Sequence, residues 1–192
     1  MQMLTLPPKS SALVLIDLQK GITSFPIAPR ASTEVVRNAT SLASRFREIG
    51  APVFLVRVAF PTGETALKLV TDAQPPLPAS EPEGWLELAV EPHQEDILIL
   101  KRHWGAFYGT ELDLQLRRRG IETIVLGGIS TNFGVESTAR NAYEFGYHLV
   151  FAENAMGAFT GVNHEFAIQN IFPRLGRVRS TQEILEALGE GK

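Results

Sequence analysis

The stretch Ala12-Leu13-Val14-Leu15-Ile16-Asp17 contains the pattern that decides the fold. Its five apolar residues do not alternate with polar ones, which is typical of a strand covered by helices on both faces of a parallel sheet. Comparable short runs recur along the chain at 53–58, 97–100, 123–126, 149–152 and, more briefly, 177–179. Because helical patterns separate these runs, the sequence predicts a three-layer α/β fold: a mostly parallel six-stranded sheet with helices on both faces.

Helical spacing fills the segments between the predicted strands. Ser32 is the expected N-cap of a helix that Gly50 ends in a left-handed conformation. The helix predicted from about 135 to 145 is expected to bury one face, made of Val135, Thr138, Ala139, Ala142 and Tyr143. Further helices are predicted at three places, namely after Thr110, near 163–172 and from Ser180.

Length and composition limit the classes of protein that fit. The chain has 192 residues and a mass of 21.1 kDa, which predicts a single domain over 1–192. A net charge of −3 argues against a nucleic-acid partner, because the phosphate backbone attracts strongly basic surfaces. The absence of cysteine excludes disulfides and a thiol nucleophile. No stretch has the roughly 18–20 apolar residues of a membrane span, so we expect a cytoplasmic protein without a membrane partner.

A proline-rich segment interrupts the regular pattern after the second strand. Residues 61–95 carry 6 of the 12 prolines, so we expect little regular structure there. Loops of this length within compact domains are commonly lids or partner contacts, and a surface excursion without a role is an equal alternative. Trp85 is the residue expected to anchor this segment.

Three features come together at the carboxyl edge of the predicted sheet, where open α/β sheets bind ligands. The first strand ends in Asp17, the third ends at Lys101, and the fourth leads into the glycine-rich turn Gly127–Gly134. Such a turn presents backbone N–H groups to an anion or oxyanion. Each feature also has a structural explanation: Asp17 as a cap, Lys101 as the point where the strand meets solvent, and the glycines as tight packing.

The glycine-rich turn lacks the patterns of nucleotide-binding loops. No lysine follows Gly134 as Walker A requires, and the G-x-G-x-x-G dinucleotide pattern is missing as well. The histidines show no spacing typical of metal ligands, so each is expected to be solvated or satisfied in the core: His93, His103, His148 and His164. We therefore predict no cofactor and no catalytic metal.

Three segments together resemble the isochorismatase-like hydrolases, also called the cysteine hydrolase family. They are ALVLIDLQKG at 12–21, KRHWGAFYGTELDLQLRRRGIETIVLGGISTN at 101–132 and GVESTARNAYEFGY at 134–147. The resemblance covers nearly the whole chain and implies the same largely parallel sheet. It also implies an active site in which Asp17 and Lys101 flank the start of the helix after the fourth strand. The position of the family's nucleophilic cysteine falls on Gly134.

Glycine at position 134 bears directly on the chemistry that the resemblance implies. The family's amidases attack a carbonyl with a thiolate, and glycine has no side chain to do so. The hydroxyls of Ser130, Thr131 and Ser137 are weak substitutes unless a base is aimed at one of them. Family members that cleave isochorismate also carry glycine here. They need no nucleophilic side chain, because protonation of the enol ether followed by water attack breaks the bond. We therefore expect Asp17 to act as a general acid on an enol ether or related small anionic substrate.

The pKa of Asp17 is subject to opposing influences in this interpretation. The positive charge of Lys101 lowers it, whereas burial and a bound dianionic substrate raise it toward the range that a general acid needs. The sequence leaves the balance between these influences open.

Residues of the glycine-rich turn and of the first loop are expected to bind substrate. The resemblance implies a cis peptide bond between Ile129 and Ser130, which turns backbone N–H groups toward the substrate. Phe133 is assigned to substrate binding in the same turn. Gln19 is expected to orient Asp17 or the attacking water, and a role in the turn is equally good.

An aromatic cluster and two arginines complete the expected binding residues. Trp104 and Phe107, with Tyr108, are placed to wall a pocket for a planar ring, and packing in the core is an equal alternative. Arg57 and Arg102 lie at or just beyond strand ends, where each is a candidate partner for a substrate carboxylate or a surface charge.

The resemblance also bears on metals and partners. Nicotinamidase-type relatives hold a metal through Asp and His residues after the second strand, and the stretch 56–64 contains neither residue type. Relatives form dimers or tetramers, so a homo-oligomer is expected beside the small-molecule substrate. The main alternative to an enzyme is a catalytically degenerate binding or scaffold protein that retains the fold.

Overall fold

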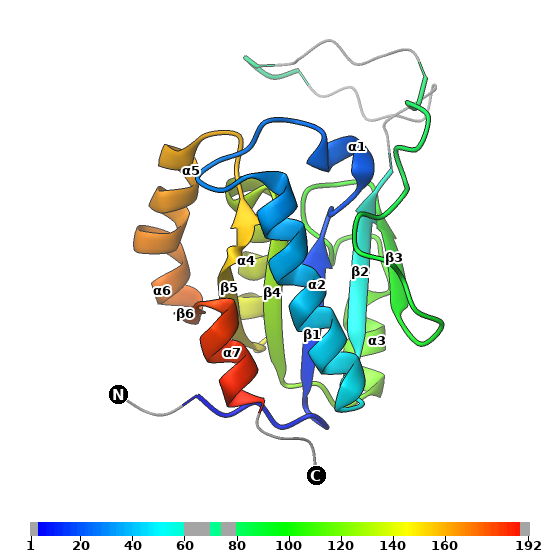
Figure 1. The fold of residues 1–192 in the computed structure, drawn as a ribbon, viewed down its shortest axis with the longest axis vertical. Helices are drawn as coiled ribbons and strands as arrows, with labels where there is room; N and C mark the ends of the chain where they lie inside the picture. The colour runs from blue at the N-terminus through cyan, green and yellow to red at the C-terminus, as the bar shows by residue number, and fades with distance from the viewer. Residues whose placement is uncertain (1–3, 60–69, 74–79, 189–192) are drawn as a thin grey trace.

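One six-stranded sheet organises the molecule, and all its neighbouring strands run parallel (Figure 1). The computed structural model describes residues 4–59, 70–73 and 80–188. The strand order is β3-β2-β1-β4-β5-β6, so the direction of winding reverses between β1 and β4. The predicted α/β class is confirmed, with a fully parallel sheet.

Strands and helices alternate along the chain. The strands are β1 (Ser11–Ile16), β2 (Val53–Val58), β3 (Ile97–Lys101), β4 (Thr123–Ile129), β5 (His148–Gly157) and β6 (Arg177–Arg179). The helices are α1 (Lys20–Thr23), α2 (Ser32–Glu48), α3 (Leu112–Arg118), α4 (Glu136–Glu144), α5 (Gly161–Phe166), α6 (Phe172–Leu175) and α7 (Thr181–Ala187). Two π-helical turns lead into α4 and α6, at Thr131–Val135 and Ala167–Ile171.

Each face of the sheet has its own apolar core. Along β1, Val14 and Ile16 point to one face and Leu13 and Leu15 to the other, as the two-residue period of a strand requires. The first face packs against α3, α4 and α6, and the second against α2 and α7, which lie in front of the sheet in Figure 1. Because both faces of β1 are buried, its sequence shows no polar alternation.

Two strands extend further than the sequence predicts. β4 continues to Ile129 and β5 to Gly157, beyond the expected ends at Leu126 and Ala152. A shift in the pairing register after Leu126 lets both strands go on past the irregular point. These extra residues carry the sheet up to the glycine-rich turn.

The predicted helices are found at the expected places, but two details of the predictions were wrong. Ser32 is the first residue of α2 rather than its N-cap, since the extended residue before the helix is Ala31. Tyr143 is 51% exposed instead of buried, because it lies about 100° around α4 from the buried Ala142. Ser180 caps α7 through a reciprocal capping box, as its position predicts. None of the described helices has the length and apolar character needed to cross a membrane.

The segment 85–89 pairs with the loop that follows β1. Trp85 anchors it: its Nε1 donates to the carbonyl O of Val58 at 2.9 Å. The ring also covers Gly21 so closely that a Cβ there would come within 2.6 Å of it. The predicted anchoring role of Trp85 is confirmed, and part of the proline-rich prediction falls outside the described residues.

Candidate active site

Asp17 and Lys101 meet in the interior at the carboxyl edge of the sheet. Asp17 directly follows β1, and Lys101 is the last residue of β3. Lys101 Nζ donates to Asp17 Oδ2 at 2.7 Å and to the carbonyl O of His103 at 3.0 Å. The side chains of Lys101 and Asp17 are 1% and 7% exposed, so water barely reaches the ion pair. The two residues form one buried pair where the strand order reverses, which is where such sheets bind ligands.

Only one carboxylate oxygen of Asp17 is paired. Oδ1 is buried and has no hydrogen-bond partner within the part of the chain that the structure describes. An unpaired buried polar atom costs about 1–3 kcal/mol, and proteins rarely leave one without a reason. The hydrogen-bonding capacity of this oxygen is therefore unused in the described chain.

The backbone at Asp17 is unusual. Its φ angle is 53°, in the left-handed region, where non-glycine residues are uncommon and cost about 1 kcal/mol or more. Its N–H still donates to Val56 O at 2.9 Å, so the turn begins directly after the ladder ends. On the neighbouring strand, Gly128 has a φ of 126°, and a Cβ there would overlap the backbone of Ile16. Glycine at 128 thus lets β4 lie against the end of β1.

Burial raises the pKa of Asp17 from 3.8 to about 6. Desolvation is the largest cause, and the charge and hydrogen bond of Lys101 oppose it only in part. The sequence left open whether burial or Lys101 has the larger influence on the pKa of Asp17. In the structure burial does, so the protonated carboxyl group is favoured. A carboxyl group with this pKa can transfer a proton near neutral pH.

Gly134 places bare backbone beside Asp17. A Cβ at this position would lie 3.1 Å from Asp17 Oδ2 and 3.0 Å from Ile16 Cγ2. Both distances are tighter than ordinary contacts, so any side chain here would force its neighbours to shift by a few tenths of an ångström. The geometry thus places position 134 against the carboxylate and leaves little space for a nucleophilic side chain.

The turn between β4 and α4 contains the cis peptide bond Ile129–Ser130 that the resemblance implies. Ser130 Oγ donates to Asn132 Oδ1 at 2.8 Å, within the turn itself. Thr131 Oγ1 shares a hydrogen bond of 2.9 Å with Nδ1 of the buried His164. Of the two roles expected for His164, solvated or satisfied in the core, the structure shows the second. Its link to the turn had no signal in the sequence, because the two residues lie 33 positions apart without a motif.

Aromatic residues predicted to bind substrate separate into two groups. The rings of Trp104 and Phe133 meet edge to face with centroids 4.8 Å apart, and Trp104 is 65% exposed. The carbonyl O of Trp104 lies 3.4 Å from the Cβ position of Gly134, so this pair stands next to the site. Phe107, in contrast, is buried in the core, where its ring packs against that of Tyr147. For Phe107, the alternative prediction of packing in the core is therefore the correct one.

The side chain of Gln19 holds the loop in place. Within the described chain it makes no hydrogen bond to Asp17. Its side-chain amide donates to Val58 O at 3.2 Å and Trp85 O at 2.8 Å, and its oxygen accepts from Val58 N at 2.7 Å. These bonds occupy both N–H donors of the amide, and its oxygen accepts one bond. The turn role is the one that the geometry supports for Gln19.

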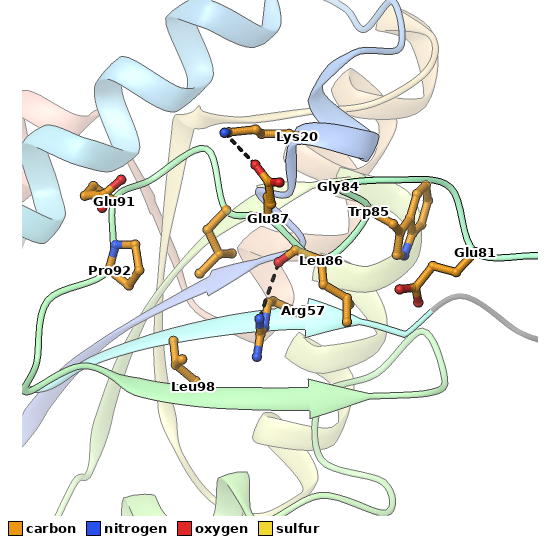
Figure 2. A pocket seen from close by; sticks show the side chains of 11 residues that line it. Lys20, Arg57, Glu81, Gly84, Trp85, Leu86, Glu87, Glu91, Pro92 and Leu98 are labelled. Atoms are coloured by element: carbon orange, nitrogen blue, oxygen red, sulfur yellow. Dashed lines mark hydrogen bonds and ion pairs between the residues drawn. The ribbon is translucent and has the colours of Figure 1, made fainter.

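Arg57 lies on the opposite face of the sheet from Lys101. The two-residue period places Arg57 with Leu55 on the face that α2 covers, whereas Lys101 shares the other face with Ile99. Arg57 lines a cavity of about 460 Å³ under the segment 81–92 (Figure 2). Its Nη1 donates to Leu86 O at 3.4 Å. Arg57 therefore faces away from the Asp17–Lys101 pair, and Arg102 is exposed, which agrees with the surface-charge alternative.

Thr138 is a site residue whose role the sequence misses. It was expected only on the buried face of the helix, yet its Oγ1 donates to Gly134 O at 2.7 Å and accepts from Ala106 N at 3.1 Å. One hydroxyl thereby joins the two loops beside Asp17. Within the described ranges, no group of three or more His, Cys, Asp or Glu side chains gathers in a way that could hold a metal ion.

Known proteins resemble the chain over nearly its whole length. The isochorismatase domain matches residues 11–183. The isochorismatase family protein YecD of Escherichia coli O157:H7 is 55% identical over 97% of this chain and 100% of its own. For the isochorismatase family protein YwoC of Bacillus subtilis, the identity is 48% over 97% of this chain and 98% of its own.

A solved structure and a more distant enzyme extend the comparison. The structure of an isochorismatase family protein from Burkholderia thailandensis is 42% identical and covers 97% of this chain and 99% of that one, with a TM-score of 0.90. Maleamate amidohydrolase of Pseudomonas putida is 26% identical over 94% of this chain and 87% of its own.

Proposed function

Because the chain belongs to the isochorismatase family of hydrolases, we propose that it cleaves an enol ether or related small anionic substrate without a covalent intermediate. Asp17 is the general acid of this proposal. The observation that supports it best is the buried Asp17–Lys101 pair, in which Oδ1 of Asp17 has no partner among the described residues. A carboxyl oxygen in this position can hold a proton and deliver it to a bound substrate.

The reaction follows from the placement of that proton. Asp17 transfers it from Oδ1 to the terminal carbon of the substrate's C=C bond, and the π electrons form the new C–H bond. The oxygen-bearing carbon becomes an oxocarbenium centre, and water adds to it. The resulting hemiketal breaks its C–O bond to give a ketone and an alcohol, while the proton lost by the water returns to Asp17. One water is consumed and the enzyme is regenerated.

Lys101 and the turn supply the electrostatic setting. Lys101 holds Oδ2 at 2.7 Å, which leaves Oδ1 as the oxygen that meets the substrate. Its charge limits how far burial raises the pKa of Asp17 and offsets a substrate carboxylate. The aromatic pair of Trp104 and Phe133 provides an apolar wall for a planar substrate. Backbone N–H groups near Ser130 are the donors proposed for substrate oxygens.

Covalent amide hydrolysis is not part of this proposal. Maleamate amidohydrolase is a relative, but this chain has no cysteine, and Gly134 offers little space beside Asp17. Of the three hydroxyls considered as substitutes, that of Thr131 is fully buried and bonded to His164. We therefore expect no ammonia release from nicotinamide or maleamate.

Turnover of isochorismate tests the proposal directly. The purified protein is expected to release pyruvate, and an Asp17→Asn variant that folds normally should not, because an amide cannot donate the proton. Equal pyruvate release by both proteins would overturn the role of Asp17. Tight binding of isochorismate with full recovery of the unchanged molecule would instead favour a non-catalytic binding protein.

We also propose that the protein works as a homo-oligomer. Large apolar side chains are exposed on and next to α5, where Phe159, Val162 and Phe166 are 50%, 78% and 58% exposed. Large exposed apolar side chains close together in the chain are typical of surfaces that contact other proteins. Light scattering should give a multiple of 21.1 kDa, and a species of 21.1 kDa alone would contradict the proposal.

A further inference from the structure

The hydrogen bond between Thr131 and His164 ties α5 to the turn beside Asp17. Thr131 Oγ1 and His164 Nδ1 lie 2.9 Å apart, and the two residues are 0% and 3% exposed. Thr131 directly follows the cis peptide bond and opens the π-helical turn that contains Gly134. A residue distant in the sequence thus contacts the segment that faces the catalytic carboxylate.

We propose that His164 is a positioning residue, which acts through Thr131 to fix the turn Ile129–Gly134 against Asp17. This inference rests on the proposed function, since it assigns His164 a part in the same site. His164 does not itself contact the reacting atoms.

The turn is built to transmit such a restraint. The N–H groups of Phe133 and Val135 both donate to Ser130 O, at 3.1 and 3.2 Å, so the turn is closed on itself. Its far end is held where Thr138 Oγ1 donates to Gly134 O at 2.7 Å. The contact between Thr131 and α5 holds the near end. Releasing either end lets Gly134 move relative to Asp17, and water can then enter.

The electrostatic state of His164 suits a positioning role. Burial lowers the pKa of His164 to about 4, and the positive charge of Arg30 adds to this effect. Arg30 itself is paired with Glu153 at 3.0 Å. The imidazole is therefore neutral wherever Asp17 titrates, and the hydrogen bond to Thr131 does not change with pH in that range.

A nucleophile and base pair is the competing explanation for Thr131 and His164. A hydroxyl next to an imidazole is the arrangement that activates an alcohol. Within the described residues, however, no hydrogen bond reaches the other ring nitrogen of His164, so the third group that orients a catalytic base is missing. The geometry favours positioning over nucleophilic attack.

Thr131→Val and Thr131→Ser form the central comparison of the test. Valine keeps the shape and removes the hydroxyl, whereas serine keeps the hydroxyl. The first readout is the pKa of Asp17 from an NMR titration of its side-chain carbon, which does not depend on turnover. Thr131→Val should lower this pKa by about one unit, because water reaches the carboxyl group, and Thr131→Ser should leave it unchanged. The second readout is kcat for isochorismate, expected to fall about tenfold with KM little changed.

Histidine variants give an independent second comparison. The amide of His164→Asn reaches the position of Nδ1 and should preserve the pKa of Asp17, whereas His164→Gln places its amide further out and should lower it. This pair decides the question if Thr131→Val does not fold.

A matched control separates positioning from general stability. Thr181 is also buried, and its Oγ1 donates to Asn154 Oδ1 at 2.6 Å at the start of α7. Thr181→Val should lower the unfolding free energy as Thr131→Val does, yet leave the pKa of Asp17 unchanged. The proposal is overturned if folded Thr131→Val keeps the wild-type pKa of Asp17, or if a fluorophosphonate probe forms an adduct on Thr131. Should the wild type fail to cleave isochorismate, the proposed function fails while the titration still decides the role of His164.

Discussion

One buried and one partly buried ion pair lie at opposite edges of the same sheet. Asp17 and Lys101 meet at the carboxyl edge, and Arg47 and Asp96 meet at the amino edge, where Asp96 immediately precedes β3. The side chain of Asp96 is 2% exposed and that of Asp17 is 7% exposed. The two carboxylates thus lose water to a similar extent.

Their hydrogen bonds differ. Arg47 donates from Nε to Oδ1 of Asp96 at 3.1 Å and from Nη2 to Oδ2 at 2.6 Å, and His93 N donates to Oδ2 at 2.8 Å. Both oxygens of Asp96 are satisfied, whereas Oδ1 of Asp17 has no partner in the described chain. A fully bonded pair fastens α2 to the loop before β3. An incompletely bonded pair costs stability and leaves an oxygen for chemistry.

The largest expected difference between the two pairs is in catalysis. Asp17→Asn should lower kcat for isochorismate by about a thousandfold or more, because the proton donor is lost. Asp96→Asn should leave kcat nearly unchanged and lower the unfolding free energy by about 1–3 kcal/mol, since it removes the charged partner of the partly buried Arg47. Steady-state kinetics and urea unfolding of both variants measure this. An equal loss of kcat in Asp96→Asn and Asp17→Asn would contradict the claim that only the Asp17 pair serves catalysis.

Replacing the cations sharpens the electrostatic part of the comparison. Lys101→Met should raise the pKa of Asp17 above about 6, because burial is then unopposed. Arg47→Met should leave the pKa of Asp17 where it is, since Arg47 lies at the other edge. NMR titration of Asp17 in each variant gives the values. A pKa of Asp17 that falls in Lys101→Met would contradict the assigned influence of Lys101.

Glycines near each pair are expected to respond differently to a methyl group. Gly134→Ala should reduce kcat about tenfold and the unfolding free energy by about 1–3 kcal/mol, because its Cβ crowds Asp17 and Ile16. Gly50 lies near Arg47 with open space at its Cβ position and a φ of 70°, so Gly50→Ala should cost about 1 kcal/mol in stability alone. Unchanged kcat in Gly134→Ala would argue against the tight placement of Gly134.

The smallest effect is expected at the aromatic wall. Trp104→Leu should raise KM for isochorismate about fivefold with kcat little changed, because an exposed stacking surface is lost. Tyr108→Leu is the matched control, since Tyr108 is 72% exposed and its ring contacts that of His103 rather than Phe133. A larger rise of KM in Tyr108→Leu than in Trp104→Leu would move the binding surface away from Gly134.

The fold could be predicted because its evidence is local. The apolar run before Asp17 reports burial on both faces, and the same kind of run marks each later strand. The ends of β4 and β5 escaped prediction, since the register shift after Leu126 depends on how two strands pair. Tyr143 was misplaced because one step along a helix moves a side chain out of the buried stripe.

The site could be predicted only in part. Asp17 and Lys101 lie at one edge because parallel strands end there, as the predicted parallel sheet implies, and the family resemblance supplied the expectation that they share a site. The face of a side chain and its partners depend on packing, so Phe107 lies in the core and Gln19 braces a loop. The contact of His164 with Thr131 joins residues that no local pattern connects.

The central claim is that burial holds Asp17 as a proton donor near neutral pH. Its most direct test is to measure kcat/KM for pyruvate release from isochorismate between pH 5 and pH 8, beside an NMR titration of Asp17 in the same protein. Because the acid must be protonated, we predict that kcat/KM falls tenfold per pH unit above about 6, with the same midpoint as Asp17. A titration midpoint of Asp17 near 4, together with kcat/KM that stays constant or rises over this range, would contradict the claim.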